Sequence, residues 1–391
     1  MFTLLKNAEI YTPDQAGTND LLIAGSRIAA IRPNISIPKG LPDLQEIDCS
    51  DKILCPGFID QHVHISGGGG EGGPASRTPE INLSMLTMAG ITTVIGLLGV
   101  DGITRSMAEL LTKARALEEE GITAYIYTGA YEIPTRTLTG NVRSDLVLID
   151  KVIGTGEIAI SDHRSAQPSM EMLTKLASEA RVGGLLGKKP GIVHLHLGDG
   201  KQRLSLLFEI LKNTDIPVSQ FVPTHVNRLD SLFDEAIEFL ELGGNIDLTA
   251  GITKENESPY ALEVHEALTR LVNAKAALNQ VTVSSDANGS MPQFAKDGRL
   301  VGISVGSAAE LWKDIAKAVR KNIIPLPTAL ALITRNVANL LKLSPVKGII
   351  AVDSDADIIL LDKEYIIDTV IAKGKLMVQN GQAVVKGYFE Q

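Results

Sequence analysis

Short apolar runs alternate with stretches of helical periodicity through the middle of the chain. Eight runs have the length and composition of strands: Phe58–Ile65, Thr92–Leu98, Thr123–Thr128, Glu157–Ser161, Ile192–Leu197, Phe221–His225, Ile246–Thr249 and Val281–Ser285. Apolar residues recur at helical spacing from Met107 to Gly121 and from Leu173 to near Gly183, where each helix is expected to end. This alternation predicts an α/β fold, and eight units favour a (β/α)₈ barrel of about 250 residues or more. An open, doubly wound sheet is the alternative.

Both ends of the chain have a different pattern, in which short strands are separated by turn residues. The strand candidates are Phe2–Leu5, Asp20–Ala24, Arg27–Ile31, Asp357–Leu361, Tyr365–Ile371, Lys375–Val378 and Ala383–Val385. Turn signals lie at Thr12–Asp14, Ala24–Ser26, Pro38–Gly40 and Asn380–Gly381, the last being a strong hairpin signal. We therefore predict that residues 1–55 and 346–391 form one small β-sandwich-like domain beside a barrel of residues 56–345.

Composition excludes several classes of partner. The chain of 391 residues has 37 Lys and Arg against 46 Asp and Glu, a net charge of −9, and no basic run that would favour nucleic acid. No apolar stretch approaches the ~18 residues that a membrane span needs. The start lacks the features of a signal peptide, and two cysteines provide no disulfide framework. We expect a cytoplasmic protein with no nucleic-acid or membrane partner.

Histidines and carboxylates gather at the ends of the predicted barrel strands. His62 and His64 form a His-x-His pair whose side chains point to the same side of a strand. Taken alone, this pair is equally compatible with two buried structural histidines. Four more candidates end or lie within later strands: Glu157, His196, His225 and Asp286. Because barrel active sites form at the carboxyl ends of strands, the set predicts two divalent ions such as zinc with a bridging carboxylate.

The remaining histidines fit this site less well. His194 faces the same way as His196 but one pleat deeper, which favours packing inside the barrel. His265 lies in a helical pattern and is expected on a solvated face. His163 is compatible with a position just behind the metal ligands, which the sequence does not decide.

These motifs resemble those of the isoaspartyl dipeptidases, also called β-aspartyl peptidases, a family within the amidohydrolase superfamily. The matching stretches run through the whole barrel and into the tail: Cys55–His64, Gly67–Glu71, Gly129–Tyr131, Ser161–Ser165, Arg181–Gly187, Pro223–Arg228, Ser284–Ser290 and Lys373–Val378. The resemblance implies a metal-dependent hydrolase that cleaves the β-aspartyl bond of dipeptides with a hydroxide shared by two ions. It also implies a homo-oligomer, an octamer.

The resemblance implies a division of the metal ligands. His62 and His64 would hold one ion together with Asp286, while His196 and His225 hold the other. Asp286 would also accept the proton of the hydroxide and deliver it to the leaving amine.

The resemblance further implies a set of substrate contacts: Gly69, Glu71, Tyr131, Arg164, Arg228 and Ser290. Glu71 would face the free α-amino group, and Tyr131 would polarise the scissile carbonyl. Arg164, Arg228 and Ser290 would hold carboxylates, which guanidinium groups bind with two parallel hydrogen bonds. Without the resemblance, surface salt bridges for the arginines and a packed ring for Tyr131 are the favoured interpretations.

Two positions depart from the family pattern. Glu157 aligns with the carboxylated lysine that bridges the metals in better-known members, so no carboxylated lysine is expected here. A glutamate is shorter, so the backbone must come closer, and Gly154 and Gly156 permit this. The alternative is a structural carboxylate beside a looser metal site. Val100 replaces a threonine, which removes a hydroxyl that contacts substrate and affects fine specificity.

Two other functions stay open at this point. A hydrolase of cyclic amides, similar to a dihydroorotase or hydantoinase, would use the same metal ligands, but its substrates lack the ammonium that Glu71 would bind. A non-catalytic assembly protein of the same fold would not need the intact set of His62, His64, His196, His225 and Asp286.

Overall fold

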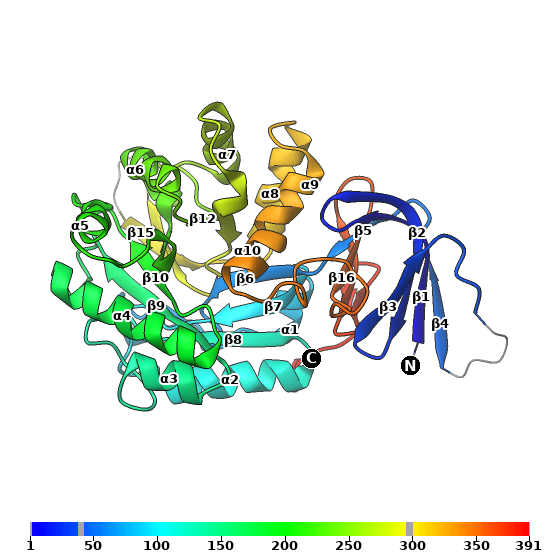
Figure 1. Ribbon diagram of the computed structural model, residues 1–391, viewed down its shortest axis with the longest axis horizontal. Coiled ribbons are helices and arrows are strands. Elements are labelled where there is room, and N and C mark those ends of the chain that lie inside the picture. Colours follow the sequence, from blue (N-terminus) through cyan, green and yellow to red (C-terminus); the bar gives the residue numbers. More distant parts are fainter. Residues whose placement is uncertain (1, 38–42, 295–299, 391) are drawn as a thin grey trace.

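The computed structural model describes residues 2–37, 43–294 and 300–390. A barrel lies beside a separate β-sheet to which both chain ends contribute (Figure 1). The predicted turn at Pro38–Gly40 lies outside the described residues.

The barrel contains eight parallel strands close to the predicted positions. They are β6 (Phe58–Val63), β7 (Ile91–Gly96), β8 (Thr123–Thr128), β9 (Val152–Ile160), β10 (Ile192–Leu197), β11 (Phe221–Thr224), β12 (Ile246–Thr249) and β13 (Val281–Ser284). The first six form one curled sheet in sequential order, and β12 and β13 form a parallel pair. A bridge from Val63 to Ala287 joins the end of β6 to the residues after β13. The structure confirms the predicted α/β barrel class.

Helices cover the outside of these strands (Figure 1). They are α1 (Leu83–Thr87), α2 (Met107–Glu120), α3 (Val142–Leu148), α4 (Met170–Gly187), α5 (Ser205–Asn213), α6 (Asp230–Glu241), α7 (Val264–Asn273), α8 (Glu310–Arg320), α9 (Leu326–Leu332) and α10 (Arg335–Leu340). The described residues also form four single-turn 3₁₀ helices: η1 (Pro74–Ser76), η2 (Val218–Gln220), η3 (Val226–Arg228) and η4 (Leu278–Gln280). None of the helices in the described ranges combines the length and hydrophobicity that a bilayer crossing requires.

Local sequence explains where α2 begins and ends. Ser106 accepts a hydrogen bond from the backbone of Glu109, and the Glu109 side chain accepts one in return, which forms a capping box. The helix buries one apolar stripe and stops at Gly121, whose φ of 126° is readily accessible to glycine. The predicted end of this helix is therefore confirmed.

The predicted end of α4 near Gly183 is wrong, because the helix continues to Gly187 and ends at Lys188. A Cβ atom on Gly183 would lie 2.9 Å from the Cβ of Leu146 on α3. A Cβ atom on Gly184 would lie 2.7 Å from the Cα of Gly191. These glycines therefore serve close packing of the helix and do not terminate it.

The second sheet joins strands from both ends of the chain. It comprises β1 (Phe2–Tyr11), β2 (Gln15–Ala24), β3 (Arg27–Arg32), β4 (Leu44–Asp48), β5 (Ile53–Pro56), β16 (Ile358–Leu361), β17 (Ile367–Ala372), β18 (Lys375–Gln379) and β19 (Gln382–Ala383). β5 pairs with β1 on one side and with β16 on the other. The two terminal segments thus form one continuous sheet.

A buried ion cluster joins this sheet to the barrel. Lys347, whose side chain is 4% exposed, lies 2.5 Å from Asp357 and 2.8 Å from Asp355. Its ammonium also donates to the hydroxyl of Thr123, the first residue of β8, at 2.6 Å. The second sheet is therefore anchored at the amino end of a barrel strand, which leaves the carboxyl ends free for a site.

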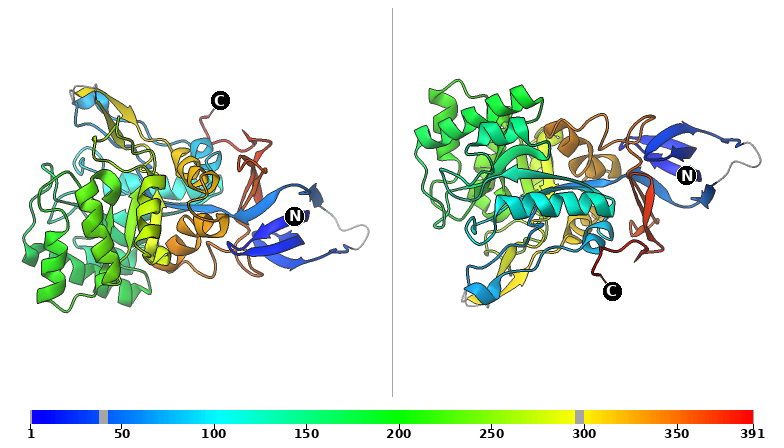
Figure 2. Two further views of the ribbon diagram at one scale, coloured as in Figure 1. Left: turned by 90° about the horizontal axis from the view of Figure 1, so that it is seen from above. Right: turned by 90° about the horizontal axis from the view of Figure 1, so that it is seen from below.

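A hairpin of β14 (Ser290–Phe294) and β15 (Leu300–Val305) projects from the barrel beside the loop that follows β6 (Figure 2). The two segments are in contact, since a Cβ atom on Gly72 would lie 3.2 Å from Ile303 Cδ1. This pairing of loops borders the carboxyl ends of the barrel strands.

Candidate metal centre

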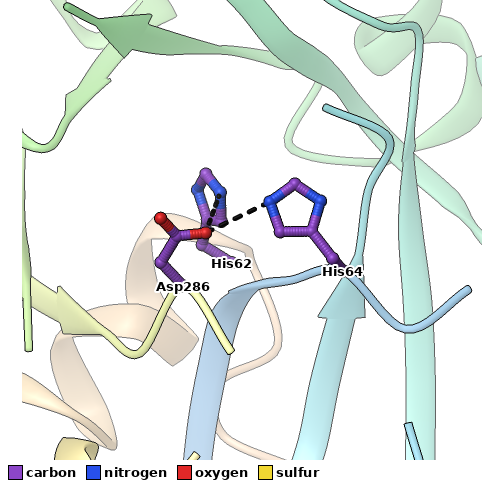
Figure 3. A group of neighbouring side chains, drawn as sticks. All are labelled: His62, His64 and Asp286. Carbon is purple, nitrogen blue, oxygen red and sulfur yellow. Dashed lines mark hydrogen bonds and ion pairs between the residues drawn. The ribbon is translucent and has the colours of Figure 1, made fainter. Parts of the chain in front are cut away.

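Six buried side chains meet at the carboxyl ends of the barrel strands: His62, His64, Glu157, His196, His225 and Asp286. Figure 3 shows three of them, His62, His64 and Asp286, directed toward one another. Asp286 Oδ1 lies 3.4 Å from His62 Nε2 and 3.1 Å from His64 Nε2. The structure therefore brings together the six candidate ligands that the sequence singled out.

Glu157 occupies the middle of this cluster. Its Oε2 lies 2.9 Å from His196 Nδ1 and 3.4 Å from His225 Nε2. Oε2 also lies 3.6 Å from His62 Nε2, and the other oxygen, Oε1, lies 3.6 Å from His64 Nε2. One carboxylate thus lies within 3.6 Å of a nitrogen of each of the four imidazoles, a position compatible with a ligand shared by two ions.

The donor set fits divalent metal ions. His62, His64 and Asp286 form one group of closely spaced ligand atoms, and His62, Glu157 and His225 form another. Two ligands on one tetrahedral zinc ion lie about 3.3 Å apart, close to the 3.4 Å between His62 Nε2 and Asp286 Oδ1. The buried Nε2 of His62 has no hydrogen-bond partner among the described residues. An unpartnered imidazole nitrogen facing carboxylates is suited to bind a cation.

The other ring nitrogen of His62 is held from below by His194. His62 Nδ1 lies 2.9 Å from His194 Nε2, and the ring of Tyr127 packs against His194 at 5.1 Å between centroids. His194 is fully buried in the barrel, as expected, and burial holds its pKa well below the usual value. A neutral His194 can accept the Nδ1 proton of His62 and leave Nε2 free for a metal.

Two more imidazoles are held in the same manner. His225 Nδ1 lies 2.7 Å from the hydroxyl of Thr249, which leaves Nε2 directed at Glu157. His196 Nε2 lies 2.9 Å from Asp162 Oδ2, which leaves Nδ1 directed at Glu157. Contacts behind metal ligands of this kind fix the ring orientation and the tautomer.

The remaining histidines lie away from the cluster. The side chain of His163 is 80% exposed, with Nδ1 3.6 Å from Asp162. His265 lies on α7 between Glu263 and Lys321, and is more buried than the expected solvated position.

Charge compensation keeps the central carboxylates ionised. Burial alone would raise the pKa of Glu157, but His62 and His196 outweigh it and hold that pKa well below its usual range. Burial likewise opposes ionisation of Asp286, and His62 and His64 overcome it, so its pKa is also low. Burial and the charge of Glu157 raise the pKa of Tyr131. The site thus combines anionic carboxylates with a protonated phenol.

A second group of charged residues lies at the mouth of the cluster. Glu71 Oε1 lies 3.2 Å from Arg164 Nη1 and accepts a hydrogen bond from Ser290 at 3.1 Å. The hydroxyl of Tyr131 lies 2.9 Å from His196 Nδ1, and the guanidinium of Arg164 stacks over the Tyr131 ring. Opposite charges and the metal ligands are therefore combined in one pocket.

These residues line two cavities that have lining residues in common. The inner one, of about 40 Å³, is bordered by the metal cluster and also by Gly69 and Val100. The outer one, of about 540 Å³, shares Glu71, Arg164 and Ser290 with it. Each predicted substrate-contact residue therefore lines the inner cavity beside the metal cluster. Arg228 borders both cavities.

Three functional candidates were missed by the sequence analysis. Asp162 contacts His196 and Arg164, and its place two residues before Arg164 was a signal that could have indicated it. Glu257 lies 2.6 Å from Arg228 Nε, but no motif marks it. Arg105 donates to Gly68 O of the glycine-rich loop at 3.0 Å and to Thr78 O at 2.7 Å, and so supports the segment that carries Glu71.

Comparison with known proteins agrees with this geometry. The Amidohydrolase family matches residues 192–377. The crystal structure of a beta-aspartyl dipeptidase from the thermophilic, keratin-degrading Fervidobacterium islandicum AW-1, in complex with beta-Asp-Leu dipeptide, is 41% identical. It superposes with a TM-score of 0.90 over 98% of this chain and 97% of that one. A D-hydantoinase structure at 18% identity and a TM-score of 0.69 shares the fold.

Curated relatives carry a different name. A dihydroorotase from Lactiplantibacillus plantarum is 29% identical over 185 residues, or 47% of this chain, and the match covers only 40% of that relative. A dihydroorotase from Aquifex aeolicus is 24% identical over 93% of this chain and 91% of its own length.

Proposed function

Because the chain belongs to the β-aspartyl dipeptidase family of the amidohydrolase superfamily, we propose that it hydrolyses the β-aspartyl amide bond of isoaspartyl dipeptides. The observation that carries this proposal is the pairing of Glu71 with Arg164 directly above the metal cluster. One anionic and one cationic group at this spacing complement a substrate that bears an ammonium and a carboxylate. Cyclic amides such as dihydroorotate offer no free ammonium to Glu71.

We propose that the cluster holds two divalent ions, zinc in the first instance. His62, His64 and Asp286 would hold one, and His196 and His225 would hold the other. Glu157 would serve both in place of a carboxylated lysine, which its contacts with all four imidazoles support. Such ions polarise the scissile carbonyl and acidify water.

In the proposed reaction, the chain's own residues move the protons and stabilise charge. Asp286, anionic and close to His62 and His64, accepts a proton from the attacking water and delivers it to the leaving amine. Tyr131 stays protonated because its pKa is raised, so its hydroxyl donates to the oxygen that becomes negative.

Residues at the mouth of the cavity bind the substrate in this proposal. Glu71 binds the free α-amino group, with Gly69 allowing close approach of the loop. Arg164, Arg228 and Ser290 bind carboxylates, and all three border the outer cavity. Val100 presents an apolar surface to the inner cavity, so the contact that a threonine hydroxyl makes is absent.

The alternative function is hydrolysis of a cyclic amide, as in a dihydroorotase. The names of the curated relatives favour it, although the L. plantarum match spans two fifths of that relative. A non-catalytic assembly role is the least supported, because the metal-ligand set is intact and clustered.

A substrate panel tests the proposal. Purified protein supplied with zinc is incubated with β-Asp-Leu, α-linked Asp-Leu, N-acetyl-β-Asp-Leu and dihydroorotate. We expect cleavage of β-Asp-Leu alone, with two metal ions per chain by elemental analysis and loss of activity with a chelator. Turnover of dihydroorotate without cleavage of β-Asp-Leu would replace this function with the alternative.

The proposal also covers the location, the oligomeric state and the domain boundaries of the enzyme. We propose a cytoplasmic homo-oligomer, an octamer as in the family, whose chains divide into a barrel of residues 56–345 and a domain of residues 1–55 and 346–391. Sedimentation velocity measures the oligomeric state, and limited proteolysis followed by mass spectrometry measures the boundaries.

A further inference from the structure

Asp162 lies between the metal cluster and the substrate-facing arginine. Its side chain is 2% exposed. Oδ2 lies 2.9 Å from His196 Nε2 and 2.7 Å from Arg164 Nη2. Oδ1 accepts from Arg164 Nε at 3.0 Å and from the Arg164 backbone at 2.7 Å. One carboxylate therefore holds two groups that face different parts of the pocket.

The contact with His196 determines which ring nitrogen can bind a metal. A hydrogen bond from Nε2–H to Asp162 places the lone pair on Nδ1, the nitrogen that lies 2.9 Å from Glu157. His62 and His225 are held from behind by an imidazole and a hydroxyl, those of His194 and Thr249. Arg164 Nη2 and Arg228 Nη1 also lie 3.4 Å from His196 Nε2. Asp162 Oδ2, at 2.9 Å, is nearer and can accept the Nε2 proton, which a guanidinium cannot. A carboxylate in this position raises ligand basicity.

The contact with Arg164 orients the guanidinium. Asp162 occupies Nε and Nη2, which leaves Nη1 as the end that reaches Glu71 and the cavity. A guanidinium fixed along one edge presents the other edge at low entropic cost.

We propose that Asp162 is a positioning residue that couples the metal centre to substrate recognition, through His196 on one side and Arg164 on the other. The Arg164 half rests on the proposed function, whereas the His196 half does not. Substitution of Asp162 therefore weakens metal binding in the absence of substrate and weakens substrate binding in the metal-loaded enzyme.

Zinc affinity, measured by competition with a chromophoric chelator, tests the His196 half. We expect Asp162→Asn to weaken zinc binding by about 10- to 100-fold. Asp215→Asn, at an exposed position in the α5–β11 connection, is the matched control and is expected to bind zinc as the unmodified chain does. Asp162→Ser provides a second variant of different size, and native folding of both is checked by circular dichroism. Unchanged zinc affinity in either folded variant overturns the proposal.

Steady-state kinetics with saturating zinc test the Arg164 half. We expect Asp162→Asn to raise KM for β-Asp-Leu more than it lowers kcat, and Arg164→Met to raise KM while zinc affinity stays unchanged. A fall in kcat with no change in KM contradicts the coupling. If the unmodified enzyme does not cleave β-Asp-Leu, the proposed function fails, yet the zinc competition still decides the role of Asp162 at His196.

Discussion

Glu71 and Arg164 form an ion pair across the mouth of the metal centre, with 3.2 Å between Glu71 Oε1 and Arg164 Nη1. The two residues lie 93 positions apart in the chain. The inner cavity beneath them measures only about 40 Å³, which is too small for a dipeptide. We therefore expect substrate to separate the pair, its ammonium replacing Arg164 beside Glu71 and its carboxylate replacing Glu71 beside Arg164.

Glu71→Gln tests this exchange of partners. Loss of one charge from a desolvated pair costs about 2–5 kcal/mol. The Glu71 side chain is 26% exposed, so we expect the low end of that range, a fall in kcat/KM for β-Asp-Leu of about 30-fold. N-acetyl-β-Asp-Leu should be a poor substrate for both proteins, so the preference for a free amine shrinks in the variant. Glu80→Gln, at an exposed carboxylate paired with Lys113, is the control and should be neutral. Full preference for the free amine in Glu71→Gln would remove Glu71 from this role.

Glu157 provides a test of how the metals are bridged. Glu157→Gln keeps the shape but removes the charge between four imidazoles, so zinc affinity and turnover should both fall. Reconstitution of the unmodified enzyme should be indifferent to bicarbonate, because no carbamate forms. Glu157→Lys should recover activity only in part, and better with bicarbonate. Two metals and normal turnover in Glu157→Gln would make Glu157 structural.

Gly156 allows β9 to approach β10 next to this ligand. A Cβ atom there would lie 2.7 Å from His194 O and 2.8 Å from His194 Cβ. We expect Gly156→Ala to displace Glu157 and to lower zinc affinity by about tenfold or more, as for loss of a contact behind a ligand. Gly140→Ala is the control, because its φ is also positive but no atom lies within 4 Å of the added Cβ. Equal zinc affinity in the two variants would contradict this packing role.

Lys347 is predicted to dominate the stability of the junction between the sheet and the barrel. Lys347→Met leaves the buried Asp357 without its cation, whereas Asp355 keeps its ion pair with Arg27. The loss should lower the free energy of unfolding by about 3 kcal/mol. Lys363→Met removes an exposed ion pair with Asp51 and should cost no more than about 1 kcal/mol. Urea denaturation of both variants measures the difference, and similar losses would contradict the prediction.

The metal-free protein should lose stability in acid. The pKa values of Glu157, Asp162 and Asp286 are lowered in the folded state, because partner charges and hydrogen bonds outweigh burial. A carboxylate of this kind stabilises the fold above its unfolded pKa, about 4, and the contribution disappears as pH falls through the folded value. Urea midpoints at pH 6 and pH 3 should differ less in Asp162→Asn than in the unmodified chain. An identical pH dependence would exclude Asp162 as a contributor.

The barrel could be predicted because its strands are local apolar runs, and the ligands could be predicted because strand ends converge in space. His64 and Asp286 could be recognised because each lies at the end of a predicted strand, although 222 positions separate them in the chain. Glu257 could not be found, because it lies in the irregular connection between β12 and α7, and the path of that connection brings it to Arg228. Gly183 was misinterpreted because a glycine that stops a helix and one that permits close packing have the same sequence signal.

The pairing of β5 with β16 has a consequence for biosynthesis. β5 lies within the first 56 residues, but the strand that covers its open side spans Ile358–Leu361. During translation the backbone edge of β5 therefore stays unpaired until the residues of β16 have left the ribosome. An unpaired edge invites association with other chains, so the nascent protein is exposed to aggregation throughout the synthesis of the barrel. Premature termination before Ile358 leaves a product with that edge permanently open.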